Sequence, residues 1–182
     1  MHATIVTNDQ ELEQIAALSQ ANNTALLTAA EKAKEGFVTW SYNMEILQQV
    51  HRLTPPVIVK DGDTVAGYAI VLTKEAADIY PPLKEMLQHF EQITYNDKPL
   101  NSYHYYVMGQ ICVHPDYRGK GVFQQLYDHH KKLYAARYDF LLTEISVANH
   151  RSLRAHQRTG FRTIHRYEDK LGSWEVVVWN WD

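Results

Sequence analysis

The segment from residue 110 to residue 123 constrains the fold of this chain more than any other part of the sequence. Its first half is apolar up to Val113 and has the pattern of a β-strand, which Pro115 then ends. Two glycines, Gly119 and Gly121, follow in a short loop before a helical pattern begins. Glycine permits the sharp turn and the close backbone approach that such a loop needs. The segment therefore predicts a strand, a glycine loop and a helix in direct succession.

The start of that helix is suited to an anionic ligand. The first N–H groups of a helix have no intrahelical partner, and the helix dipole adds partial positive charge at the same end. Arg118 and Lys120 bring two cations into the loop. A phosphate or pyrophosphate group is the expected ligand.

Two common nucleotide-binding loops do not fit these residues. A P-loop needs Ser or Thr after its Gly-Lys pair, whereas here Gly121 follows Lys120, and no upstream glycine has the required spacing. A dinucleotide-binding fingerprint needs a third glycine where this chain has Gln124. An ordinary strand-to-helix turn is the alternative that needs no ligand.

The rest of the sequence alternates strand and helix patterns. The length of 182 residues suits one domain, residues 1–182. Ala21 to Ala33 is rich in alanine and is expected to be helical or a helical hairpin. The pattern predicts an α/β (α+β) fold with a mixed sheet and helices on both faces. Strands are expected at 4–6, 57–60, 65–73, 103–113, 140–147, 162–167 and 174–181. Helices are expected from residue 8 or 9 to 18, from 41 to the prolines at 55 and 56, and at 83–90, 122–138 and 149–158.

The net charge of −3 is unevenly distributed along the chain. Residues 1–113 hold 7 lysines and arginines against 13 acidic residues, whereas residues 114–170 hold 11 against 6. This split agrees with two ligands of opposite charge, and also with chance clustering on solvated surfaces. The acidic total gives no reason to expect a nucleic-acid partner.

Several signals point to a cytoplasmic protein without a membrane partner. No apolar stretch is long enough to cross a bilayer, and Met1 to Gln14 lacks the pattern of a signal peptide. The single cysteine, Cys112, cannot form an internal disulfide. The histidines show no metal-ligand spacing, so no metal site is expected.

Two motifs resemble the GNAT superfamily of N-acetyltransferases. The acetyl-CoA motif of that family is Gln/Arg-x-x-Gly-x-Gly/Ala, which fits Arg118 and Gly121 and departs from it at Phe123. A second element fits Asn149 and its downstream Gly-Phe pair, with His156 where the family usually has Tyr. The resemblance covers residues 103–167.

This resemblance implies a GNAT-like fold with a mostly antiparallel central sheet. It also implies direct transfer of acetyl from acetyl-CoA, as cosubstrate, to a primary amine of a small molecule or peptide. The backbone of residues 112–114 would pair with the pantetheine arm, the N–H groups of 119–123 would hold the pyrophosphate, and Asn149 would touch the cofactor side of the cleft. The implied cofactor-binding residues are Cys112, Val113, His114, Arg118, Gly119, Lys120, Gly121, Val122, Phe123 and Asn149.

Two ionisable side chains are candidates for the proton transfers. Glu144 lies in an otherwise apolar strand, where lost solvation should raise its pKa towards that of a useful base. His156 occupies the position of the family's proposed acid, and an imidazolium can protonate a thiolate near neutral pH. The structural alternatives are a carboxylate bonded to a neighbouring hydroxyl or arginine, and a packing histidine. Cys112 has no evident basic partner, so an acyl-enzyme is not expected.

The functional alternatives stay open at this stage. The missing Tyr at position 156 also fits a catalytically silent acyl-CoA-binding module used for sensing or assembly, and the acyl group could be larger than acetyl. The acceptor pocket is expected near Phe37 to Tyr42 and in the excursion from Lys74 to Ser102, where acidic balance favours a cationic amine. A homodimer through the strand 174–181 is possible.

Overall fold

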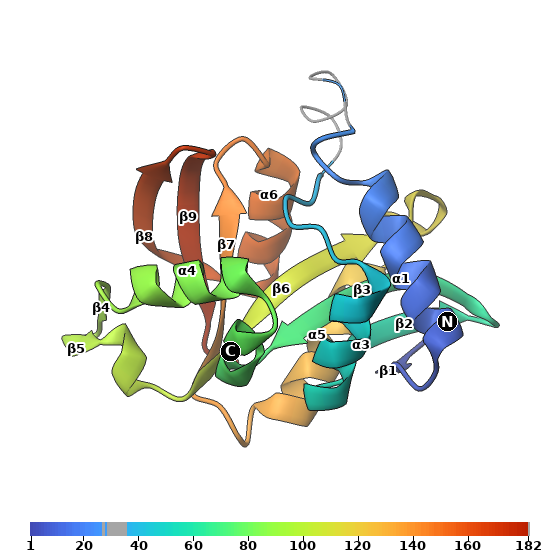
Figure 1. The fold of residues 1–182 in the computed structure, drawn as a ribbon, viewed down its shortest axis with the longest axis horizontal. Helices are drawn as coiled ribbons and strands as arrows, with labels where there is room; N and C mark the ends of the chain where they lie inside the picture. Colours follow the sequence, from blue (N-terminus) through green and yellow to red (C-terminus); the bar gives the residue numbers. More distant parts are fainter. Residues whose placement is uncertain (27, 29–35, 182) are drawn as a thin grey trace.

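The computed structural model describes residues 1–26, 28 and 36–181. In this part of the chain a seven-stranded sheet has the order β1-β2-β3-β6-β7-β9-β8 (Figure 1). Neighbouring strands pair antiparallel except β6 and β7, which run parallel. The strands are β1 (His2–Ile5), β2 (Val57–Asp61), β3 (Thr64–Leu72), β6 (Tyr105–Val113), β7 (Phe140–Ser146), β8 (Arg162–Asp169) and β9 (Gly172–Trp179), beside a small hairpin of β4 (Thr94–Tyr95) and β5 (Lys98–Pro99).

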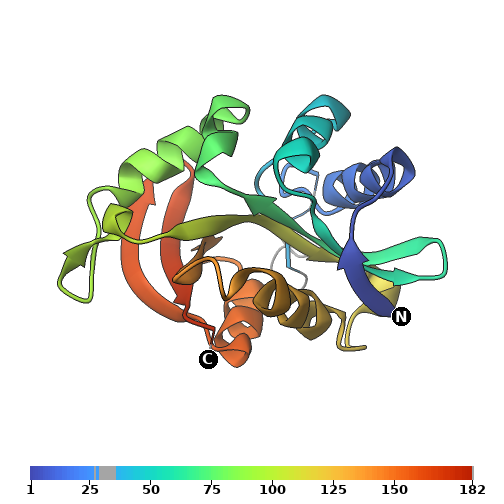
Figure 2. The same ribbon diagram turned by 90° about the horizontal axis from the view of Figure 1, so that it is seen from below.

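Helices cover both faces of this sheet. Figure 2 shows α1, α3 and α4 on one face and α5 and α6 on the other. The helices are α1 (Asp9–Ala21), α3 (Met44–Leu53), α4 (Pro81–Phe90), α5 (Val122–Tyr134) and α6 (His150–Thr159). The predicted fold class, a mixed and mostly antiparallel sheet with helices on both faces, is confirmed.

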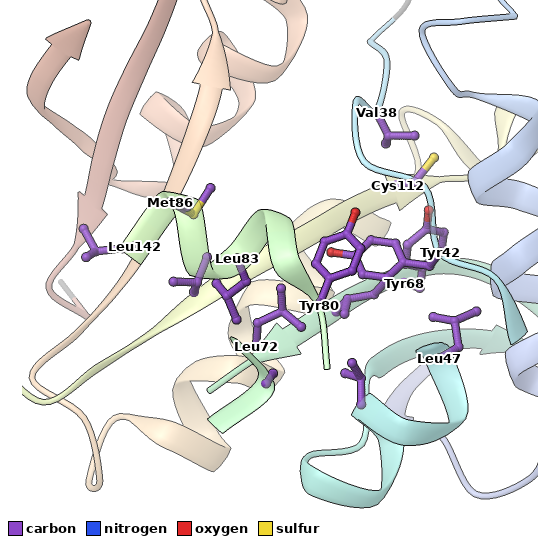
Figure 3. Packing of buried hydrophobic residues seen from close by; sticks show 14 of the residues in the cluster. Val38, Tyr42, Leu47, Tyr68, Leu72, Tyr80, Leu83, Met86, Cys112 and Leu142 are labelled. Atoms are coloured by element: carbon purple, nitrogen blue, oxygen red, sulfur yellow. The ribbon is translucent and has the colours of Figure 1, made fainter. Parts of the chain in front are cut away.

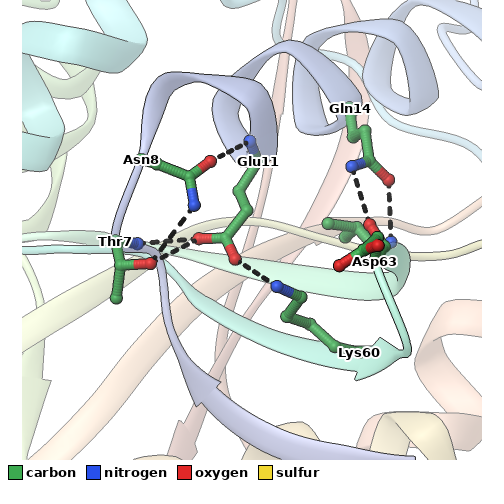
Figure 4. Close-up of polar contacts among 7 residues, drawn as sticks. Thr7, Asn8, Glu11, Gln14, Lys60 and Asp63 are labelled. Carbon is green, nitrogen blue, oxygen red and sulfur yellow. Dashed lines mark hydrogen bonds and ion pairs between the residues drawn. The ribbon is translucent and has the colours of Figure 1, made fainter.

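Half-buried polar contacts fix α1 against the sheet (Figure 4). Asn8 caps the helix, since its Oδ1 accepts a 3.0 Å hydrogen bond from the Glu11 N–H. The Glu11 carboxylate accepts 2.7 Å and 2.6 Å bonds from the Thr7 N–H and from Nζ of Lys60 on β2. Although burial alone would raise the pKa of Glu11, the Lys60 and Thr7 bonds lower it, so the pair stays ionised. These contacts hold the N-terminal end of α1 against β2.

The core on the α1, α3 and α4 face is rich in tyrosine (Figure 3). The rings of Tyr42 and Tyr80 stack with centroids 4.8 Å apart, and the buried Tyr68 lies in the same layer. The Tyr42 hydroxyl and Leu72 occupy the space beside Gly109, where an added Cβ would lie 2.5 Å from Leu72 Cδ1 and 2.8 Å from that hydroxyl. Only glycine fits at this point in β6. It coincides with an irregularity in the pairing of β3 with β6, because Gly109 has no partner between Met108 and Gln110.

Three expected features differ from the structure. The helix expected to reach Tyr138 ends at Tyr134. Helix α1 ends at Ala21, after which Thr24 and Asn22 pair with the backbone of Val38, so a helix over Ala21 to Ala33 is wrong for 22–26, while 27 and 29–33 lie outside the described residues. Strand β9 pairs with β7 on one side and β8 on the other. It therefore has no free edge for pairing between subunits.

Candidate active site

Strands β6 and β7 part beside α6 (Figure 1), and a cleft opens at this point. The two strands pair only from Tyr105 to Val107 on β6, and beyond that point Thr143 Oγ1 donates a 3.0 Å hydrogen bond to the Met108 carbonyl. Two adjoining cavities fill the opening. The loop cavity, about 370 Å³, lies between the end of β6, the loop 117–121 and α6. The strand cavity, about 90 Å³, lies between β6, β7 and residues 37–40.

The glycine loop forms a cradle of backbone N–H groups at the loop cavity. Gly119 and Gly121 have φ angles of 74° and 78°, a left-handed conformation that favours glycine. No side chain among the described residues caps α5, which begins at Val122, so its first N–H groups are left for solvent or a ligand. These groups and the helix dipole suit a phosphate oxygen.

Arg118 anchors this loop to two other elements. Its Nη2 donates a 2.9 Å hydrogen bond to Oδ1 of Asn22 at the end of α1, and its Nε donates a 3.4 Å bond to the Val113 carbonyl. Arg118 therefore ties the N-terminal helix and β6 to the cradle. Lys120 lies with its Nζ 5.2 Å from the Tyr117 ring centroid, at the exposed rim of the loop.

The backbone at the end of β6 is only partly available to a ligand. The His114 N–H already donates a 2.9 Å hydrogen bond to the Ala66 carbonyl on β3. Because backbone groups alternate along a strand, those of Val113 then face the opening. Cys112 is buried, and burial raises the pKa of its thiol to about 12. A protonated thiol in the core is not a nucleophile.

Helix α6 forms the opposite wall of the loop cavity. Asn149 caps it, since its Oδ1 accepts from the Ser152 N–H at 3.2 Å, while its Nδ2 donates to the Phe37 carbonyl at 2.8 Å. Asn149 thus joins the helix start to the segment that borders both cavities. Arg151 and Arg158 line the loop cavity and bring positive charge to an anionic ligand there.

His156 lies in the core, 2% exposed, and does not present a charged ring to the cleft. Its Nδ1 donates to the Ser152 carbonyl at 2.8 Å, and its Nε2 accepts from the Tyr127 hydroxyl at 2.7 Å. Burial lowers the pKa of His156 to about 4, so the ring is neutral at neutral pH. A neutral ring bonded at both nitrogens is not the imidazolium acid expected from the sequence.

Phe123 packs against the buried His156 ring. Its ring meets those of His156 and Tyr127 edge to face, with centroids 5.2 Å and 5.1 Å apart. The residue that departs from the motif therefore packs against the residue that departs from the second element. Both substitutions lie in one aromatic cluster between α5 and α6.

Glu144 lies on β7 in the wall of the strand cavity. Burial raises the pKa of its carboxyl to about 7, although interaction with the Tyr167 hydroxyl lowers it in part and the charge of Asp169 raises it. Its Oε1 is buried and has no hydrogen-bond partner among the described residues. A carboxylate in this state is suited to accept a proton near neutral pH.

The sequence offered little reason to single out Gln110, which organises the floor of the strand cavity. Its Oε1 accepts from the Ser19 and Tyr68 hydroxyls at 2.7 Å and 2.6 Å, and its Nε2 donates to the Trp40 carbonyl at 2.7 Å. Gln110 thereby holds residues 37–40 over β6. The only signal was an amide in an otherwise apolar strand.

The fold and site together define a class, the acyltransferases that take an acyl group from a CoA thioester. Residues 23–161 match the acetyltransferase (GNAT) family, and the chain belongs to that family. No curated protein sequence matches the chain. The helices of the described residues include none long and apolar enough to pass through a membrane.

Solved structures share this fold at low sequence identity. A chain of the NatC complex bound to Gag peptide and CoA is 14% identical, with a TM-score of 0.65 and 99% of each chain covered. The N-acetyltransferase from Staphylococcus aureus Mu50 is 15% identical, with a TM-score of 0.63 and 100% of both chains covered. The protein yncA from Salmonella typhimurium, solved with its cofactor acetyl-CoA, is 17% identical with a TM-score of 0.60, covering 100% of this chain and 95% of its own.

Acetyl-CoA use is typical of the family, and the residues of the loop cavity fit that cosubstrate. Uncapped N–H groups of 121–123 suit the pyrophosphate, and the open edge of β6 at Val113 suits the amide-bearing pantetheine arm. The arginines at 151 and 158 suit a further phosphate. The strand cavity differs chemically, because Glu144 contributes a carboxylate to its lining in place of these cations.

Proposed function

We propose that this chain transfers the acetyl group of acetyl-CoA directly to a primary amine of a small molecule or peptide. The observation that carries the proposal is the adjacency of the two cavities, which share Phe37, Val38, Ile111, Asn149 and Ser152 in their walls. An anion cradle thus opens into a space that contains a buried carboxylate with a raised pKa. In this proposal residues 1–182 act as one domain, since β1 and β8, from opposite ends of the chain, belong to one sheet.

Glu144 is the general base of the proposed reaction. The cosubstrate supplies an activated acetyl thioester, and the acceptor arrives as an ammonium that must lose a proton before its nitrogen can attack. The partner-free Oε1 of Glu144 accepts that proton. The buried, protonated Cys112 takes no part, which supports direct transfer over an acyl-enzyme.

The walls of the strand cavity favour an acceptor with an apolar group near its amine. Residues 37–40, expected from the sequence to border the acceptor, lie there with Met86 from the excursion and Trp174 from β9. Among the described lining residues Glu144 is the one carboxylate. A single negative group suits one ammonium, which the aromatic side chains also attract.

A silent acyl-CoA-binding module is the second candidate, and the state of His156 favours it. At the position of the family's tyrosine this chain has a neutral ring bonded to Tyr127 and Ser152, which leaves no charged acid at that point. This alternative predicts CoA binding without turnover. It also gives Glu144 no role in any reaction.

Release of free thiol from acetyl-CoA over a panel of amines separates the two candidates. The panel contains apolar monoamines, polyamines, aminoglycosides and peptides with a free N-terminus. Direct transfer predicts turnover with at least one class, and about a hundredfold or greater loss of kcat in Glu144→Gln with CoA affinity unchanged. Tight CoA binding with no turnover in any class would support the silent module. Propionyl-CoA and butyryl-CoA, run in parallel, test the size of the acyl group.

A further inference from the structure

Tyr167 lies on the same face of the sheet as Glu144, two strands away. On the sheet Tyr167 of β8 pairs with Trp174 of β9, which pairs with Ser146 of β7, so the side chains of Tyr167 and Glu144 share one face. The Tyr167 hydroxyl interacts with the carboxylate, and burial and the Glu144 charge raise the pKa of Tyr167. That hydroxyl is therefore protonated, so it is a hydrogen-bond donor.

The ring of Tyr167 is itself held in place by α4. The His89 ring lies against it with centroids 3.9 Å apart. The next residue on the same face of α4, Met86, lines the strand cavity. Helix α4 therefore packs against the Tyr167 ring through His89.

We propose that Tyr167 is a positioning residue for Glu144: its hydroxyl holds one carboxylate oxygen and leaves Oε1 as the oxygen that meets the acceptor's ammonium. The inference rests on the proposed function, because it assumes that Glu144 is the base. It accounts for a buried carboxylate whose Oε1 has no partner in the described residues although the Tyr167 side chain lies on the same face of the sheet. A carboxylate free to rotate would present either oxygen, and its base strength would vary with its orientation.

The other titratable groups near this pair come from β8, α4 and α6. Asp169 of β8 accepts a 2.9 Å hydrogen bond from Trp174 Nε1, and its charge raises the pKa of Glu144. His165 of β8 and His89 of α4 have ring centroids 5.8 Å apart, and burial with the charge of His165 lowers the pKa of His89. His156 of α6 lines the same cavity and is neutral. Tyr167 and Asp169 therefore act on the carboxylate in opposite directions.

These opposite signs give a test that general damage to the fold cannot mimic. Tyr167→Phe removes a donor to the carboxylate and should move the Glu144 titration midpoint upward by about one pH unit. Asp169→Asn keeps an acceptor for Trp174 but removes a negative charge, and should move the midpoint downward by less. The midpoints are read from carboxyl resonances of ¹³C-glutamate-labelled protein, with Glu144→Gln identifying the signal, and melting temperatures verify folding.

The kinetic arm follows the pH profile of kcat/KM with the best amine of the panel. Its acidic limb should move upward by about one pH unit in Tyr167→Phe, with kcat recovering at high pH. Tyr95→Phe is the matched control, because the Tyr95 hydroxyl bonds to Asn180 outside both cavities. It should shift neither the midpoint nor the limb.

The two arms separate this inference from the proposed function. An unchanged Glu144 midpoint in folded Tyr167→Phe overturns the positioning role, whatever the enzyme turns over. An upward shift by NMR in a protein that acetylates no amine supports the hold of Tyr167 on Glu144 and counts against the proposed function alone. Equal shifts in Tyr167→Phe and Tyr95→Phe also overturn the inference.

Discussion

The Tyr127 hydroxyl donates a 2.7 Å hydrogen bond to Nε2 of His156, and this bond decides the state of a residue in the second family element. The opposite nitrogen donates to the Ser152 carbonyl, so the neutral tautomer has one proton and one acceptor, and both are satisfied. The His156 ring packs edge to face against the rings of Phe123, Tyr127 and Phe161. His156 therefore joins α5 to α6.

The first prediction concerns the effect of His156→Phe on stability. The substitution leaves the buried Tyr127 hydroxyl without its acceptor, and should lower the free energy of unfolding by about 1–3 kcal/mol, with kcat changed less than threefold. Urea unfolding and steady-state kinetics measure the two effects. Tyr127→Phe removes the other partner, and the double variant should recover part of the loss. A tenfold fall in kcat at unchanged stability would instead restore His156 as an acid.

The second prediction concerns acid sensitivity. Burial lowers the pKa of His156 to about 4 and that of His130 to about 3, so both bind a proton more readily when unfolded. Stability should therefore fall as the pH drops below about 6.5 and should be unaffected by these groups above it. Between pH 7 and pH 5 each histidine should lower the free energy of unfolding by about 2 kcal/mol. The loss measured by urea unfolding at the two pH values should be about 2 kcal/mol smaller in His156→Phe. An equal loss in both proteins would contradict the assignment.

The third prediction compares two glycines with similar backbones. Gly121 and Gly62 have φ angles of 78° and 60°, and a Cβ at either would have no neighbour nearer than 4.0 Å. An alanine should cost each site about 1 kcal/mol of backbone strain. Only Gly121→Ala should also weaken CoA binding, by about tenfold in calorimetric titration, because the strain disturbs the N–H cradle. Comparable weakening in Gly62→Ala, in the β2–β3 turn outside the lining of the loop cavity, would show that the effect is not specific to the cradle.

The fourth prediction tests the raised pKa of Glu144 without any assay of activity. Its pKa of about 7 lies above the ordinary 4.5, so the folded state binds more protons between these values and stability from this group is lost as the pH rises through 7. Glu144→Gln removes this dependence. The free energy of unfolding of the variant, measured with urea and compared with that of the unchanged protein, should rise by about 2 kcal/mol between pH 5.5 and pH 8.5. Glu45→Gln on the exposed side of α3 should gain nothing, and a similar gain there would contradict the prediction.

Much of the fold followed from local patterns. The two strands on either side of residues 61–63, the start of α5 after Gly121 and the helix that begins near Asn149 each depend on residues close together in the chain. Glu144 was also found in this way, because one acid in a continuously apolar strand must lose solvation wherever that strand packs. The end of α5 could not be predicted from the sequence, because the helical pattern of apolar residues continues past Tyr134.

The sequence by itself determined the class of fold and the anion cradle, since turns, caps and glycine conformations are set by neighbouring residues. Only the tertiary structure decided that His156 is neutral, that Arg118 is an anchor bonded to Asn22 and that Tyr167 shares a sheet face with Glu144. The protonation state of a histidine or carboxyl depends on burial and on partners from distant elements. Strand register and helix packing bring those partners together, and no local pattern encodes them.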